Sequence, residues 1–305
     1  MAANFDPTRL DPERVRRAFE RAAPTYDAAA VLQREIGQRM AERLDLIKLK
    51  PAVILDAGCG TGEALGELHA RYPGALLVGI DLAHGMTVAA RQRAAAQRSL
   101  FGRLLGSLAR PGADVPRLVC GDVGRLPLTG ACVDLVWSNL TLQWVNDLAG
   151  AFAEFHRALS IGGLLMFTTF GPDTLKELRA AFTRADSATH TSRFIDMHDI
   201  GDVLVHAGFA DPVMDMEMVT LTYGDATTMM RELKAMGAHN ATTGRPRGMM
   251  GRDRWGRMLA ALEAFRRDAR LPATFEVIYG HAWKPEPRLA PDGRAIVRFE
   301  RPGRK

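Results

Sequence analysis

The 305-residue sequence contains only three cysteines, Cys59, Cys120 and Cys132, and no CxxC pair. An odd number of cysteines without ligand spacing favours neither a disulfide framework nor a zinc site, so we expect no metal. The opening MAANFDPTRLDPERV contains acidic residues and no apolar segment, and no later run reaches the about 18 apolar residues of a membrane span. We therefore expect a cytoplasmic protein without a signal peptide or a membrane segment.

Charge is unevenly distributed along the chain. The net charge is +5, but residues 241–305 hold 15 Lys and Arg against 7 Asp and Glu. A basic region on a nearly neutral body suggests an acidic partner, and composition alone leaves open nucleic acid, a membrane surface and an acidic carrier protein. A solvated basic surface explains the same excess without any partner.

Short β-rich runs alternate with amphipathic stretches over residues 50–185. The β-rich runs are Ala52–Asp56, Ala75–Asp81, Arg117–Gly121, Cys132–Ser138 and Gly163–Phe170. The helical patterns between and after them are Gly62–Arg71, Ala83–Gln97, Asp147–Leu159 and Pro172–Arg184. Strands that alternate with helices of this length predict an α/β fold with a doubly wound, buried parallel sheet.

The flanks of this region predict more helices and two more strands. Helical patterns at Pro12–Ala23 and Ala28–Leu49 precede the first strand and could cover the carboxyl end of the sheet, where open α/β folds bind ligands. After a helix at Met197–Ala207, strands are expected at Asp211–Thr222 and Thr274–Trp283. The connection between these strands is too long for a simple turn. It contains two helical patterns, which we interpret as a cap or substrate lid: Ala226–Met236 and Arg252–Arg267.

The strongest local motif is the glycine-rich turn GCGTG at residues 58–62, between the first strand and a helix. Glycine lacks Cβ, so such a turn bends sharply and lets a ligand approach the backbone. A dinucleotide fingerprint needs a glycine where Glu63 stands, and a Walker A loop needs a GK[ST] ending, so NAD and ATP are disfavoured. Asp81 ends the second strand and Asp122 follows the third, where carboxylates can accept hydrogen bonds from a ribose and an adenine amino group, respectively. Each aspartate alone could be a helix cap or turn residue, but with the turn they indicate an adenosine without phosphates.

These motifs, together with Ser138-Asn139 and Gln143-Trp144, resemble those of class I S-adenosylmethionine (SAM)-dependent methyltransferases. The resemblance implies a Rossmann-like sheet of seven strands with the last strand antiparallel, and SAM as the cofactor. It also implies that the glycine turn lies under the methionine portion, that Asp81 holds the ribose and that Asp122 and Val123 meet the adenine. The cofactor-binding residues implied in this way are Asp56, Gly58, Cys59, Gly60, Gly62, Asp81, Leu82, Met86, Asp122, Val123 and Asn139.

We therefore divide the chain into four parts. Residues 1–50 are expected to form an N-terminal helical cap and residues 51–185 the SAM-binding Rossmann-like core. Residues 186–285 hold the remaining strands with a helical lid at about 224–272, and residues 286–305 form a basic tail. The basic, leucine-rich stretch Ser99–Pro116 interrupts the alternation, and its leucines suit core packing better than a partner-binding face.

Motifs in the flanks resemble a narrower family, the malonyl-[acyl-carrier protein] O-methyltransferases of biotin synthesis. They are FERAAPTYD at 19–27, SNLTLQW at 138–144, FTTFGPDTLKEL at 167–178 and LKAMGAHN at 233–240. The resemblance implies that the free carboxylate of a malonyl thioester becomes a methyl ester, early in biotin biosynthesis, with an acyl-carrier protein or coenzyme A as the carrier. A small-molecule carboxyl methyltransferase of the trans-aconitate type and a non-methylating, SAM-binding assembly factor are the alternatives. SNLTLQW stands where base-flipping methyltransferases carry an Asn-Pro-Pro-Tyr loop, so we expect no nucleic-acid substrate.

A malonyl carboxylate is ionised at neutral pH, so its methylation needs no general base, and no Ser/His/Asp or Cys/His arrangement stands out. We expect polar side chains that orient the carboxylate, and we select Tyr26, Gln143 and Arg193 as catalytic candidates. Their structural alternatives are packing at a helix junction, a loop hydrogen bond and a surface salt bridge, respectively. We expect a monomer that receives an acidic carrier protein on the arginines Arg245, Arg247, Arg252, Arg254 and Arg257.

Overall fold

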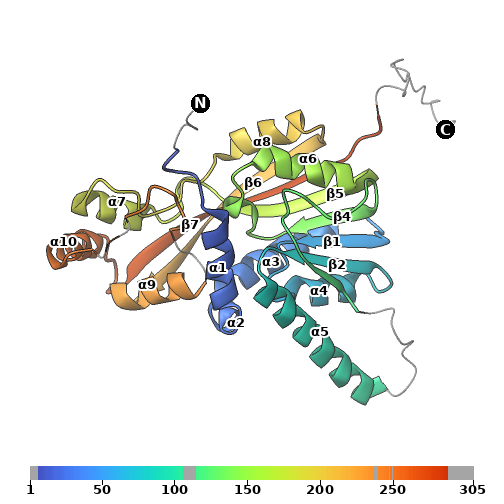
Figure 1. Ribbon diagram of the computed structural model, residues 1–305, viewed down its shortest axis with the longest axis horizontal. Coiled ribbons are helices and arrows are strands. Elements are labelled where there is room, and N and C mark those ends of the chain that lie inside the picture. The colour runs from blue at the N-terminus through green and yellow to red at the C-terminus, as the bar shows by residue number, and fades with distance from the viewer. Residues whose placement is uncertain (1–5, 106–114, 237–239, 247, 249, 288–305) are drawn as a thin grey trace.

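The computed structural model describes residues 6–105, 115–236, 240–246, 248 and 250–287. Within these residues, seven strands form one sheet in the order β3-β2-β1-β4-β5-β7-β6 (Figure 1). Strands β1 to β5 pair in parallel, whereas β7 is antiparallel to both of its neighbours, β5 and β6. The predicted doubly wound sheet with an antiparallel last strand is confirmed. The strands are β1 (Val53–Ala57), β2 (Leu76–Asp81), β3 (Arg117–Cys120), β4 (Val133–Ser138), β5 (Leu159–Phe170), β6 (Ala210–Tyr223) and β7 (Leu271–Trp283).

Helices cover both faces of the sheet, and each face has its own hydrophobic cluster. Ile54 and Leu55 are neighbours on β1 and are both fully buried, but they belong to different clusters because successive side chains of a strand point to opposite faces. Helices α3, α4, α7, α9 and α10 contribute to the cluster of Ile54, and α6 and α8 to the cluster of Leu55. The helices are α1 (Pro12–Ala22), α2 (Tyr26–Ala29), α3 (Val31–Arg43), α4 (Glu63–Arg71), α5 (His84–Leu105), α6 (Leu148–Ala158), α7 (Lys176–Ala185), α8 (Met197–His206), α9 (Ala226–Ala235) and α10 (Arg252–Glu263), with 3-10 turns at Leu44–Leu46 and Leu142–Trp144.

Several helix boundaries differ from the sequence prediction for local reasons. The segment expected as one helix over residues 28–49 is divided into α2 and α3 at Ala30, whose φ of −80° and ψ of 37° leave the helical region. Helix α7 begins at Lys176 rather than at position 172, because the preceding Leu175 has a positive φ of 54°. Helix α5 continues to Leu105 and thereby includes the start of the predicted insertion. The rest of that insertion, residues 106–114, lies outside the described residues, as does most of the predicted tail, residues 288–305.

Two helices, α9 and α10, occupy the connection between β6 and β7, where helical patterns were expected. Met229 and Leu233 of α9, like Met258 and Leu262 of α10, are buried in the cluster that contains Ile54. Both helices therefore pack into the body of the protein, and they gather with α7 at one end of the long strands β6 and β7 (Figure 1). Their role as a substrate lid stays a prediction. None of the described helices is both long enough and apolar enough to cross a membrane.

Gly280 on β7 allows the close approach of β5. A Cβ atom at this position would lie 2.3 Å from the ring of Phe167, which is fully buried and has little room to move. We expect Gly280→Ala to lower the free energy of unfolding by about 1–3 kcal/mol, the usual cost of overpacking a core. Urea unfolding of the native protein and the variant measures this difference.

Gly256→Ala is the matched control. Gly256 lies inside α10, where a Cβ would meet no atom within 4 Å, so this variant should be up to about 1 kcal/mol more stable than the native protein. A Gly280→Ala variant as stable as the native protein would contradict the packing described for β5 and β7.

Candidate active site

The three glycines of the turn after β1 have different surroundings. All three have a positive φ: 85° at Gly58, 51° at Gly60 and 77° at Gly62. A Cβ on Gly58 would lie 2.0 Å from Thr141 Oγ1, and a Cβ on Gly62 would lie 2.9 Å from Ala90 Cβ on α5. At Gly60 a Cβ would meet no atom within 4 Å, so this residue borders open space. The turn is therefore packed at two positions and open to a ligand at the third.

Two cavities flank this turn. The cavity here called the β2–β3 cavity, about 470 Å³, is lined by residues at and after the ends of β2 and β3, among them Asp81, Leu82, Met86, Asp122 and Val123. The β1–α3 cavity, about 280 Å³, lies between the end of β1 and helix α3, and its lining includes Asp56 and Cys59. Four residues line both cavities and mark the point where they meet: Tyr26, Gly58, Gly60 and Asn139. Of the residues predicted to bind the cofactor, Gly62 lines neither cavity, since it faces Ala90 instead.

The β1–α3 cavity is lined by three residues with buried polar atoms that have no hydrogen-bond partner among the described residues. They are Gln33 Oε1, Asp56 Oδ2 and Trp137 Nε1. Asp56 is 2% exposed and Trp137 1% exposed, so neither is satisfied by bulk solvent. Unsatisfied buried groups are costly, and a concentration of them around one cavity indicates a polar ligand with both donors and acceptors.

Two carboxylates beside the turn have raised pKa values. Burial, and then the negative charge of Asp81, raise the pKa of Asp56 to about 8. Burial also raises the pKa of Asp81 to about 6, although the N–H groups of Ala83 and Gly60 donate to this carboxylate at 2.8 and 2.9 Å. A cation bound between these carboxylates would favour their charged forms.

Tyr26 begins α2 and stands where the two cavities meet. Its neighbour Asp27 anchors this helix to the glycine turn, because it accepts hydrogen bonds from Thr61 Oγ1 and Arg93 Nη2, each at 2.5 Å. Burial and the nearby carboxylates of Asp81, Asp27 and Glu63 raise the pKa of Tyr26 well above its ordinary value. Tyr26 is therefore a neutral hydroxyl, able to donate a hydrogen bond at the junction.

Asn139 reaches the same junction but uses its side chain to hold two elements together. Its Nδ2 donates to the carbonyl of Gln33 on α3 at 2.9 Å, and its Oδ1 accepts from Thr168 Oγ1 on β5 at 2.7 Å. Asn139 therefore fixes the wall that α3 contributes to the β1–α3 cavity.

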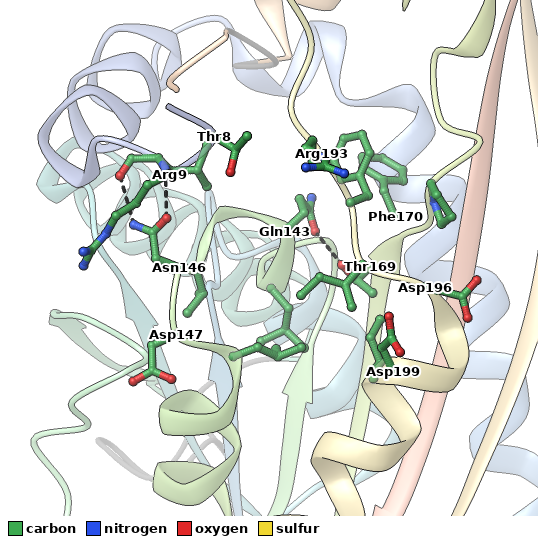
Figure 2. A pocket seen from close by; sticks show the side chains of 18 of the residues that line it. Thr8, Arg9, Gln143, Asn146, Asp147, Thr169, Phe170, Arg193, Asp196 and Asp199 are labelled. Atoms are coloured by element: carbon green, nitrogen blue, oxygen red, sulfur yellow. Dashed lines mark hydrogen bonds between the residues drawn. The ribbon is translucent and has the colours of Figure 1, made fainter. Parts of the chain in front are cut away.

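The other two catalytic candidates, Gln143 and Arg193, border a separate cavity. This β5–α8 cavity, about 680 Å³, lies between the end of β5 and the segment that leads into α8. In Figure 2 Gln143 enters it from the loop after β4 and Arg193 from the segment before α8. Gln143 Nε2 donates to the carbonyl of Leu140 at 2.6 Å, and its Oε1 accepts from Thr169 Oγ1 at 3.4 Å. Neither candidate lines the two cavities beside the glycine turn, but the β5–α8 cavity adjoins the β2–β3 cavity through shared lining residues: Arg9, Val145, Asn146 and Asp147.

Sequence reasoning missed a contact at the border of these two cavities. Asn146 Oδ1 accepts from the N–H of Leu10 at 2.8 Å, and its Nδ2 donates to the carbonyl of Leu10 at 2.9 Å (Figure 2). The N-terminal segment is thereby held across the loop after β4. Trp144, whose motif was recognised, packs edge-on against Phe19 of α1 with ring centroids 5.3 Å apart and lines the β2–β3 cavity. No local sequence pattern predicts the Leu10–Asn146 and Phe19–Trp144 contacts, because the two residues of each pair lie more than a hundred positions apart.

The described residues contain no group of three or more His, Cys, Asp or Glu side chains placed to hold a metal ion.

Comparison with known proteins agrees with this geometry. Residues 55–167 match a methyltransferase domain family. A malonyl-[acyl-carrier protein] O-methyltransferase of Laribacter hongkongensis is 56% identical over 292 residues, which cover 95% of this chain and 96% of the relative. A protein of the same name from Halorhodospira halophila is 44% identical over 280 residues, 91% of this chain and 90% of the relative.

The chain belongs to the malonyl-[acyl-carrier protein] O-methyltransferase family. The fold is shared with a solved structure, the YcgJ protein of Bacillus subtilis, at a TM-score of 0.55 and 15% identity over 82% of this chain and 99% of that chain. This methyltransferase uses SAM as its cofactor.

The residues around the glycine turn of the methyltransferase fit SAM. We propose that Asp56 and Gln33 Oε1 accept from the ammonium of its methionine end and that Trp137 Nε1 donates to the carboxylate. The β2–β3 cavity offers Asp81 and Asp122 to the adenosine. The transferable methyl group would then lie where the two cavities meet, beside Tyr26.

The raised pKa of Asp56 predicts a pH-dependent difference in stability. In the folded methyltransferase Asp56 keeps its proton up to about pH 8, whereas in the unfolded chain it loses the proton near 3.8. Folding therefore retains a proton between these values, and the native protein loses stability as the pH rises towards 8. Asp56→Asn has no proton to lose. Its stability relative to the native protein should rise by about 1 kcal/mol per pH unit from pH 6 to pH 8 and level off above.

Urea unfolding without cofactor at pH 6, 7, 8 and 9 measures this difference. Two pH profiles that run parallel throughout would show that Asp56 titrates at its ordinary value in the folded state.

Proposed function

We propose that this chain methylates the free carboxylate of a malonyl thioester carried by an acyl-carrier protein, early in biotin synthesis. The arrangement of the cavities supports this proposal most directly, because the β5–α8 cavity, about 680 Å³, is large enough for an acyl chain and shares four lining residues with the β2–β3 cavity. The names of the relatives, which are similar to this chain over nearly its whole length, support the malonyl group and the carrier protein.

The reaction needs alignment more than it needs acid–base chemistry. SAM held in the β1–α3 and β2–β3 cavities would supply a methyl group on a positively charged sulfur, and this sulfur would keep the electron pair of the carbon–sulfur bond when the methyl group passes to a carboxylate oxygen. The carboxylate is already ionised at neutral pH, so no side chain has to remove a proton. The protein accelerates such a step by holding the reacting atoms in line and excluding water.

Tyr26 and Gln143 are suited to orient the carboxylate from two sides. Tyr26 offers a neutral hydroxyl at the cofactor junction, and it is held there by the anchoring of α2 through Asp27. Gln143 lines the β5–α8 cavity, and its hydrogen bonds to Leu140 and Thr169 keep it in a fixed position. Neutral donors suit this role, because a strong ion pair to the carboxylate would stabilise the ground state and slow the transfer.

The exposed arginines of α10 are suited to receive an acidic carrier protein. Arg252, Arg254 and Arg257 are exposed on this helix, and the large apolar side chain of Trp255 is 36% exposed among them. Arg245 is half-buried in the loop before α10, and Arg247 lies outside the described residues. Arginines around an exposed aromatic ring form a surface that combines electrostatic attraction with apolar contact.

The proposed reaction is tested by mass spectrometry of the products formed from SAM and four acceptors: malonyl-carrier protein, malonyl-coenzyme A, free malonate and trans-aconitate. We expect one methyl group on the malonyl thioester, removed by mild ester hydrolysis, and the highest kcat/KM for the carrier protein. Methylation of trans-aconitate alone would indicate a small-molecule methyltransferase. Tight SAM binding without methylation of any acid would indicate an assembly factor.

The docking surface is tested with the double variant Arg245→Glu/Arg252→Glu. We expect KM for malonyl-carrier protein to rise about tenfold at low salt, and the difference to shrink at high salt because exposed charges are screened. KM for malonyl-coenzyme A and the affinity for SAM should stay the same. Arg91→Glu, an exposed arginine on α5, is the control and should leave all three values unchanged. An unchanged KM for the carrier protein would mean that this surface does not receive it.

A further inference from the structure

A fourth cavity, the α7 cavity, lies beside the C-terminal half of α7 and has a volume of about 240 Å³. Its lining comprises side chains of α7 and of the segment that follows, among them Arg179, Phe182, His190 and Arg193. The other three cavities each contain at least three carboxylates, whereas this lining holds two arginines, a histidine, four hydroxyl groups and no carboxylate. Its chemistry is that of an anion-binding site.

The two arginines of the α7 cavity differ in exposure and in their hydrogen bonds to the rest of the protein. Arg179 Nη2 donates to the carbonyls of Pro172 and Thr174, each at 2.6 Å, which fixes the guanidinium, and its Nε is buried without a hydrogen-bond partner among the described residues. Arg193 is exposed and forms no ion pair or hydrogen bond with another described residue, although its charge adds to the hydrogen bonds from Thr8 that lower the pKa of Asp6. One arginine is thus a fixed part of the wall, and the other is available to a ligand.

Phe182 and His190 form another part of the lining of the α7 cavity. His190 stacks on Phe182 with ring centroids 4.1 Å apart and planes 10° apart, and its Nε2 lies 2.7 Å from Asp186 Oδ1. Burial raises the pKa of the Asp186 carboxyl, but hydrogen bonds from His190 and the N–H of Ala188 outweigh this effect and hold the pKa below its ordinary value. Asp186 therefore stays charged and keeps His190 in place.

The α7 cavity lies between the β5–α8 cavity and the exposed arginines of α10. Arg193 lines both the α7 cavity and the β5–α8 cavity, so the two adjoin. At the end of α7, Arg254 Nη1 of α10 lies 3.9 Å from Asp186 Oδ2, and Arg257 Nη2 donates to the carbonyl of Ala185 at 3.0 Å. A long acceptor can therefore run from the cofactor through the β5–α8 cavity to the α7 cavity and end at α10.

We propose that the α7 cavity binds the phosphate of a phosphopantetheine arm and that Arg193 donates to it. This assignment rests on the proposed methylation of a malonyl thioester: with the carboxylate at the cofactor, the pantetheine chain lies in the β5–α8 cavity and its phosphate reaches the arginines. Arg193 then acts on the phosphate rather than on the malonyl carboxylate.

The test compares malonyl-pantetheine, which lacks the phosphate, with malonyl-4′-phosphopantetheine as methyl acceptors. In the native enzyme we expect KM to be about tenfold lower for the phosphorylated acceptor, the factor given by one charge-assisted hydrogen bond. In Arg193→Gln the ratio of the two KM values should fall to about one, and Arg193→Lys should recover part of the advantage. Arg184→Gln, an exposed arginine of α7 outside the cavity lining, is the matched control and should keep the full advantage.

Equal KM values for the two acceptors in the native enzyme, or an equal loss in Arg193→Gln and Arg184→Gln, would overturn the assignment of the phosphate. Absence of methyl transfer to every malonyl thioester would instead overturn the proposed function. Calorimetric titration with 4′-phosphopantetheine and with pantetheine reads out the phosphate site without turnover, and binding of both with equal affinity would also overturn the assignment. Malonyl-carrier protein and malonyl-coenzyme A distinguish the sources of the arm, since Arg245→Glu/Arg252→Glu should affect only the former.

Discussion

Hydrogen bonds between the N-terminal segment and the loops at the carboxyl edge of the sheet hold the ligand cavities in shape. Three pairs make this connection: Asp27 with Thr61, the Gln33 carbonyl with Asn139, and Leu10 with Asn146. Asp27 reaches the glycine turn after β1, whereas Gln33 and Leu10 both reach the loop between β4 and α6. The cofactor cavities therefore have one wall from the sheet and one from the N-terminal helices, and neither part alone encloses a ligand.

The sheet and the glycine turn could be predicted from the sequence because both are local properties. Apolar runs mark buried strands, and glycines with positive φ mark a turn, as at Gly58, Gly60 and Gly62. The sequence did not distinguish Gly60, which borders open space, from Gly62, which packs against α5, because that difference depends on a residue 28 positions away, Ala90.

The walls of the site were harder to predict because they are built from distant pairs. Gln33 and Trp137 are ordinary residues in sequence, and only their burial without partners beside Asp56 identifies them. Gln143 and Arg193 were selected for the chemistry of their side chains, and the structure brings them to the same cavity although 50 positions separate them. Which ligand group each one meets depends on how the four cavities adjoin, and no pattern in the sequence carries that information.

The place of β7 in the sheet affects how the protein is assembled. β7 is the last strand of the described residues, but it lies between β5 and β6 and is antiparallel to both. Strands β1 to β5 can pair as they leave the ribosome, whereas β6 has no neighbour in the sheet until residues 271–283 have been synthesised. The half of the sheet that carries the glycine turn can therefore form first, and β6 is exposed to proteases and chaperones for as long as β7 is missing.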